Sequence, residues 1–169
     1  MLFRVALVLS LAACGPPAAQ LAALEKQRVA EEFPVVPMQL VIARGGRGAL
    51  VLSLADDGTL REGQTVVGSL KGTRVVGAKG EEIVAVEGDG RVTHAGKRTP
   101  IRFEREELES DNGRRISVDD AGAVVFAPPM HGRRARTTFR FEGFAPKARR
   151  TALLVLLVVV LENEKETEE

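Results

Sequence analysis

The sequence contains a single cysteine and lacks both tryptophan and tyrosine. With one thiol, no disulfide can form within the chain, even in an oxidising compartment. With only seven Phe as aromatic residues, the chain offers few surfaces on which bases or sugar rings stack. The formal net charge of +1 provides no general attraction to nucleic acid, and we expect no nucleic-acid partner.

Recognisable catalytic motifs are also missing. No serine lies in a G-x-S-x-G context, and no phosphate-binding GxxxxGK[ST] loop is present. Three carboxylate pairs lie beside turns or in a polar connection: Glu81-Glu82, Glu106-Glu107 and Asp119-Asp120. Glycoside cleavage requires two carboxyl groups at a defined distance, which adjacency in the sequence does not establish. We therefore predict no enzyme activity, no catalytic residue and no cofactor. The alternative is an envelope hydrolase, or an accessory subunit of one, that uses carboxylates on a sheet face.

Metal ligands are equally few. His94 and His131 are the only histidines, and a metal site would need both beside a carboxylate such as Asp120. The aspartates of the turns suggest calcium, but neither an EF-hand loop nor a calcium-binding nonapeptide is present. Turn formation explains these carboxylates without an ion, so we predict no metal site. They are Asp56, Asp57, Asp89, Asp119 and Asp120.

The chain has two uncharged apolar runs, and each is much shorter than the ~20 residues of a membrane-spanning helix. The first, Val5–Ala13, follows Arg4 and ends in small residues, a pattern typical of a secretory signal. What separates it from an ordinary secretory signal is a cysteine directly after Leu11-Ala12-Ala13.

Residues 1–15 resemble the bacterial lipoprotein family, whose lipobox corresponds here to Leu11-Ala12-Ala13-Cys14. The resemblance implies cleavage between Ala13 and Cys14, a diacylglycerol group on the Cys14 sulfur, and an acyl chain such as palmitate on the new amino terminus. Two or three chains make a stable anchor, whereas one binds only marginally. Membrane lipid is then a partner, and the expected location is the bacterial cell envelope. Gly15 favours the outer over the inner membrane, because an Asp there commonly marks inner-membrane retention. Alternatively, Cys14 is an incidental thiol in a discarded signal peptide.

The rest of the chain divides by composition. We expect a signal peptide (1–13), an anchor and tether (14–20), a short helix with a proline-containing linker (21–37), a β domain (38–144), a basic and then apolar segment packed on that domain (145–161), and an acidic tail (162–169).

The β domain is predicted from short apolar or alternating runs separated by turn residues. Asp57-Gly58, Asp89-Gly90 and Asn112-Gly113 are dipeptides that favour two-residue primed hairpin turns, which predicts antiparallel pairing. The six predicted strands are 38–43, 49–54, 82–86, 115–118, 123–127 and 137–143.

An internal repeat runs through this domain. Gly58, Gly90 and Gly122 recur at a spacing of 32 residues, each followed two residues later by Leu or Val. Similar repeats occur in uncharacterised envelope lipoproteins, which this chain resembles without any activity being implied. We predict a mainly β, antiparallel fold of about three repeats, closing as a sandwich, a small barrel or a β-roll.

Two features stand apart near the end of the sequence. The apolar run Thr151–Leu161 is expected to be a helix packed on the sheet, with a strand or a membrane-dipping segment as alternatives. The stretch from His131 to Arg150 is rich in cations, so we consider it a possible site for anionic lipid, another envelope polymer or an envelope protein. Alternatively, these cations are simply solvated on an exposed strand. The candidate anion-binding residues are Arg133, Arg134, Arg136, Arg149 and Arg150.

Overall fold

The computed structural model describes residues 20, 24, 27–28, 31–44, 48–128 and 135–165. The described chain forms strands followed by a short 3-10 helix and one long α-helix. The strands are β1 (Met38–Arg44), β2 (Gly48–Leu54), β3 (Thr59–Glu62), β4 (Thr65–Lys71), β5 (Arg74–Gly77), β6 (Glu82–Val86), β7 (Arg91–His94), β8 (Lys97–Glu104), β9 (Glu107–Ser110), β10 (Arg115–Val118), β11 (Ala123–Ala127) and β12 (Ala135–Glu142). The helices are η1 (Pro146–Ala148) and α2 (Arg149–Lys165).

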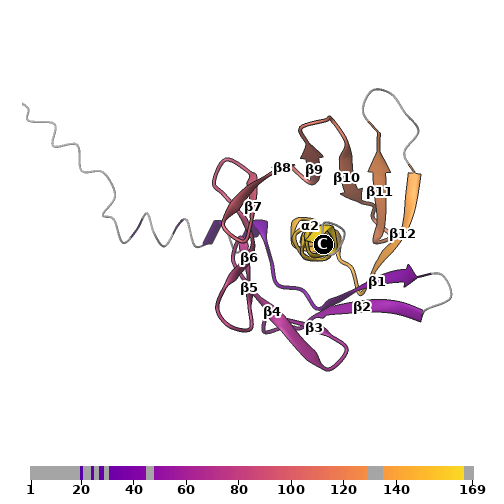
Figure 1. The fold of residues 1–169 in the computed structure, drawn as a ribbon, viewed down its shortest axis with the longest axis horizontal. Coiled ribbons are helices and arrows are strands. Elements are labelled where there is room, and N and C mark those ends of the chain that lie inside the picture. Colours follow the sequence, from indigo (N-terminus) through magenta and orange to yellow (C-terminus); the bar gives the residue numbers. More distant parts are fainter. Residues whose placement is uncertain are drawn as a thin grey trace, which may run out of the picture.

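These strands form one closed antiparallel barrel in which each strand pairs with its neighbours in sequence (Figure 1). Closure comes from the pairing of β1 with β12, which sets Gln39 opposite Glu142 and Ile42 opposite Phe139. Register shifts in β3–β4, β5–β6, β7–β8 and β11–β12 interrupt the regular ladder, and such irregularities bend strands. The expected antiparallel β class is confirmed, and of the closures left open the barrel is the one observed.

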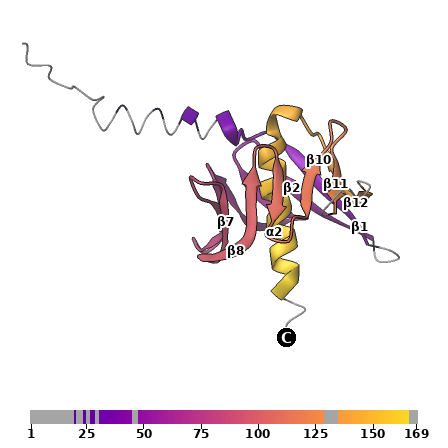
Figure 2. The ribbon, with the colours of Figure 1, turned by 90° about the horizontal axis from the view of Figure 1, so that it is seen from above.

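Helix α2 fills the interior of the barrel (Figures 1 and 2). A closed barrel widens with its number of strands, and this one has room for a helix about 10 Å across. Nine consecutive residues, Thr151–Val159, are buried, and α2 contacts β1, β5, β6, β9 and β10. A helix that is apolar on all sides requires burial on all sides. The expected burial is therefore observed, but inside the barrel rather than on one face of a sheet.

The hairpin turns at the Asp-Gly and Asn-Gly dipeptides differ from the prediction. In the β2–β3 turn, the Gly58 amide donates to the Ala55 carbonyl and the Ala55 amide donates to the Thr59 carbonyl. Only the glycine has a positive φ, at +82°. This is a three-residue loop with a glycine bulge, in which the aspartate side chain accepts a bond from the Thr59 amide. The prediction of primed turns there was wrong, because an aspartate with negative φ caps the loop.

The antiparallel path gives the barrel two distinct ends. We call the end where α2 begins the entry end and the end where it finishes the exit end. The tips of β2–β3, β6–β7, β8–β9 and β10–β11 lie at the entry end, and those of β3–β4, β5–β6 and β7–β8 lie at the exit end.

Several predicted segments lie outside the described residues. These include the signal peptide, the lipobox with Ala13 and Cys14, and the tether up to residue 19. The described residues of the 20–32 region are helical but not contiguous, so the N-terminal helix stays a prediction.

Candidate functional site

At the entry end, Arg149 joins the first turn of α2 to two hairpin tips. Its guanidinium bonds to the carboxylates of Glu106, in the β8–β9 tip, and Asp120, in the β10–β11 tip, the latter at 2.6 Å. Burial alone would lower the pKa of Arg149, but the bonds to the two carboxylates raise it above its ordinary value. The side chain is only 18% exposed. Arg149 therefore acts as a fixed ionic link between the helix and the rim of the barrel.

Arg150 forms a second link beside it. Its guanidinium carbon lies 4.8 Å from the ring centre of Phe33 and 5.4 Å from that of Phe103. The two rings pack edge to face at 5.7 Å, and Glu32 Oε2 lies 3.5 Å from Arg150 Nη2. Such stacking favours a cation both electrostatically and through contact area. Arg150 thus attaches the chain before β1 to the start of α2.

We call residues 31–37 the strap, because they lead to β1 from beside the start of α2. Phe33 is 2% exposed, and the Pro34 carbonyl accepts a 2.9 Å bond from the buried Thr151 hydroxyl. Without that acceptor the buried hydroxyl would carry a desolvation cost. In Figure 2 the strap and the start of α2 lie at the same end of the barrel.

The candidate anion-binding residues are not all brought together. Arg149 and Arg150 lie at the entry end in ion pairs with carboxylates. Arg136 lies on β12, and nothing is described of its side chain; Arg133 and Arg134 lie outside the described residues. The expected anion site stays a prediction, with two of its cations already engaged by acidic side chains.

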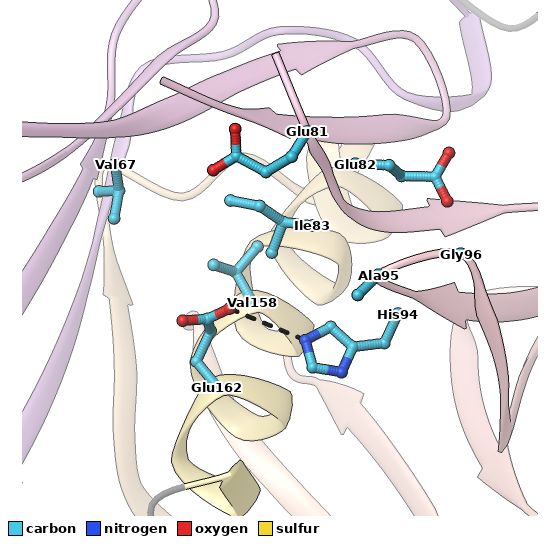
Figure 3. Close-up of a pocket in the computed structure, with 9 residues that line it drawn as sticks. All are labelled: Val67, Glu81, Glu82, Ile83, His94, Ala95, Gly96, Val158 and Glu162. Atoms are coloured by element: carbon cyan, nitrogen blue, oxygen red, sulfur yellow. Dashed lines mark ion pairs between the residues drawn. The ribbon is translucent and has the colours of Figure 1, made fainter. Parts of the chain in front are cut away.

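The exit end holds a cavity of about 540 Å³ between the wall of the barrel and α2 (Figure 3). Val67, Ile83 and Val158 supply its apolar surface, and Ala95 and Gly96 form the turn beside it. Glu81, Glu82, His94 and Glu162 are its polar members.

His94 lies in the wall of this cavity, next to Glu162 of α2. Its side chain is 14% exposed, and its Nε2 atom lies 3.7 Å from Glu162 Oε1. Nε2 is buried and makes no hydrogen bond within the described part of the chain. The contact joins β7 to α2, two elements far apart in sequence. A buried ring nitrogen without a bond is energetically costly, so it marks a place where a further donor or acceptor would be stabilising.

Two of the three cavity carboxylates are held by the barrel. Glu81 Oε2 accepts a 3.0 Å bond from the Lys79 amide. Glu82 accepts a bond from the Thr93 hydroxyl and lies 3.6 Å from Arg74. Two carboxylates are therefore fixed beside an apolar cavity before any ligand arrives.

The residues weighed as metal ligands, for which no metal site was predicted, lie apart. His94 lies at the exit end, Asp120 lies at the entry end, and His131 falls outside the described residues. In the part of the chain that the structure describes, no three His, Cys, Asp or Glu side chains are placed to hold a metal ion. Likewise, no described helix has the length and hydropathy to cross a membrane.

Comparisons with protein-family models, curated proteins and solved structures find no match to this chain. The function therefore has to be argued from the residues and their geometry. Sequence reasoning missed the strap residues Phe33 and Pro34 and the cavity residue Glu162. The burial of Phe33 and the contact of Glu162 with His94 depend on tertiary pairing, for which the sequence carries no local pattern.

Proposed function

We propose that this protein is a lipid-anchored component of the bacterial cell envelope with a non-catalytic structural or interaction role. The anchor would be Cys14 of the lipobox, and the anchored body would be the barrel. The observation that carries the role is the filling of the barrel by α2, because it makes the domain a solid scaffold whose remaining recognition surfaces are its ends and outer wall.

The ionic links at the entry end support a structural role. Glu106 and Asp120 both bind the Arg149 guanidinium, an arrangement that fixes α2 in place. A general acid and base pair would instead present two carboxyl groups to a substrate in different protonation states. The strap would carry this rigidity to the tether, so that the anchor pulls on the start of α2.

We further propose that the barrel is built from repeats of about 32 residues, with a helix over residues 21–33 whose last turn runs into the strap. Equivalent bonds support the repeat. The carbonyls of Gly58, Gly90 and Gly122 accept bonds of 2.8, 2.7 and 2.7 Å from Leu70, Phe103 and Phe141. Thr99 and Thr137 each bond the carbonyl of the valine that follows the preceding repeat glycine by two residues.

The anchor is tested by Cys14→Ala, with the native chain and Ser10→Ala compared in the same cells. We expect the Cys14 variant to move from the membrane fraction to the soluble fraction and to lose incorporation of labelled palmitate. Ser10→Ala, inside the apolar run, should behave as the native chain. Membrane association of the Cys14 variant, together with no label on the native chain, would disprove the anchor.

A further inference from the structure

We propose that the exit-end cavity binds an alkylammonium group, as a free amine or as the lysine side chain of a partner. Its position is independent of the anchor, because none of its residues belongs to the N-terminal segment. The proposal goes beyond anchoring and specifies what the interaction role of the barrel would recognise.

The first argument is the shape and lining of the cavity. A volume of about 540 Å³ lies within the range of small-ligand sites. Val67 comes from β4, Ile83 from β6 and Val158 from α2, so three elements supply the apolar surface (Figure 3). A short methylene chain placed there would remove apolar surface from water.

The second argument is charge. Among the residues that the structure describes, those lining the cavity include three carboxylates and no lysine or arginine. Arg74 partly balances Glu82 from outside the lining set, whereas Glu81 accepts a bond from the Lys79 backbone amide. A cation entering the cavity therefore meets an excess of negatively charged side chains, which would repel a carboxylate ligand.

The third argument is the unsatisfied nitrogen of His94. Glu162 Oε1 and His94 Nε2 lie 3.7 Å apart, close enough for one ammonium nitrogen to donate to both when the imidazole is neutral. Glu162 is 53% exposed, so its side chain has room to move aside and admit the ligand. The ammonium would donate a hydrogen bond to the buried His94 Nε2, which has no other hydrogen bond within the described part of the chain.

The strained turn beside the cavity is consistent with this assignment. Ala95 has φ +49°, a conformation that costs free energy for a residue with a Cβ. Its amide donates a 3.0 Å bond to the Ile83 carbonyl, which fixes the turn against β6. The turn therefore holds the adjacent His94 in position at the edge of the cavity.

The test is proton NMR of the imidazole signals of the full chain in detergent micelles, titrated with n-butylammonium. The sequence has two histidines, so a His131→Gln variant assigns both signals. We expect a saturable shift of the His94 signal in the millimolar range, as suits a ligand of so few atoms. Butyrate should not bind, and n-butanol should bind at least threefold more weakly.

Glu162→Gln should weaken n-butylammonium binding about threefold to tenfold, because one charged acceptor is lost. Glu142→Gln, an exposed site on β12, is the matched control and should leave binding unchanged. No saturable shift, equal binding of n-butanol, or an unaltered affinity of the Glu162 variant would each overturn the proposal.

A second titration identifies the source of the amine. Binding of Nα-acetyl-lysine N-methylamide at least as tight as that of n-butylammonium would assign the cavity to a lysine of a partner protein. Binding of the free amine alone would assign it to a small molecule. Failure of both ligands would remove the site and leave the lipid anchor, tested at Cys14, unaffected.

Discussion

The two ends of the barrel are built differently, and their turn glycines show it most directly. At the entry end, a Cβ added to Gly58, Gly90 or Gly122 would lie 3.0, 2.7 or 2.4 Å from a carbonyl oxygen of a later strand. At the exit end, Gly63, Gly80 and Gly96 have nothing within 4 Å of that position. Gly88, in the β6–β7 tip at the entry end, also has nothing within 4 Å, so the close packing at that end belongs to the three repeat glycines.

The ionic contacts follow the same division. The first turn of α2 is fixed by two arginines and the Thr151 hydroxyl, whereas near its other end His94 Nε2 and Glu162 Oε1 lie 3.7 Å apart. Among the described residues, the buried nitrogens without a hydrogen bond do not follow this division, because Arg149 Nε and Arg150 Nε lie at the entry end and His94 Nε2 lies at the exit end. We propose that the ionic links and the repeat-glycine packing of the entry end hold the fold, and that the exit-end cavity serves recognition.

The largest loss of stability is expected from a substitution in the middle of α2, because the packing at both ends of the barrel depends on this helix. Leu154→Ala removes a fully buried side chain and should lower the free energy of unfolding by about 2–5 kcal/mol. Val160→Ala, at a partly buried position of the same helix, should cost about 1 kcal/mol. Urea denaturation followed by circular dichroism measures both. Equal losses would show that α2 is not held in the barrel as described.

A pair of glycine substitutions tests the packed and open tips directly. Gly122→Ala and Gly96→Ala impose a similar φ penalty, at +80° and +73°, but only the first brings a Cβ against a carbonyl. We expect losses of about 2–4 kcal/mol for Gly122→Ala and about 1 kcal/mol for Gly96→Ala in thermal unfolding. If the exit-end variant is the less stable of the two, the comparison is reversed.

The strap is tested by Arg150→Met, which keeps the apolar stem and removes the cation between two rings. The lost stacking and the lost pair with Glu32 should cost about 1–2 kcal/mol. Arg140→Met, at an exposed site on β12, should change stability by less than about 0.5 kcal/mol. Chemical denaturation gives the free energy of unfolding of each variant. Equal values for the two would contradict a stabilising role for the contacts between Arg150 and the strap.

The smallest effect concerns pH. The backbone bond from Thr59 lowers the pKa of Asp57 below its ordinary 3.8, so its ionised form is favoured in the folded state. This stability is present above pH 3.8 and is lost as pH falls towards the lower folded-state pKa. In Asp57→Asn the side chain keeps its oxygen acceptor but no longer titrates. Asn112 caps the β9–β10 turn in the same way, since its side-chain oxygen accepts a bond from the Arg114 amide. Acid unfolding should become shallower below pH 4 and stay unchanged at pH 7; a change only at pH 7 would contradict this cause.

The sequence predicted what local pattern controls. Alternating apolar runs identified six of the strands, and the uncharged run of Thr151–Leu161 indicated a buried helix, although one packed on the sheet rather than enclosed by the barrel. It did not predict the closure of β1 on β12, because Gln39 and Glu142 are brought together only by the accumulated twist and register of all the strands between them. The prediction of primed turns was wrong because Asp57 caps the loop through its side chain. The Asp-Gly dipeptide alone does not distinguish this geometry from a primed turn.

The candidate site was predicted less well than the fold. Arg149 and Arg150 were singled out for their charge, and their acidic and aromatic partners come from elements distant in sequence. His94 was considered as a metal ligand together with His131 and was not assigned to a site, and its contact with Glu162 on α2 was not predicted. Such contacts depend on how a helix is inserted into a barrel, which no short sequence pattern records.

The central position of α2 has a consequence for the order of folding. The helix follows all of the strands in the chain, yet it supplies the middle of the core. During synthesis the strands therefore emerge before the surface on which they must pack, and their inner faces stay exposed until the helix is available. The early strands gain little stability on their own, because the helix that completes their core is made last. We therefore expect the barrel to close late and the unfinished chain to need protection by a chaperone.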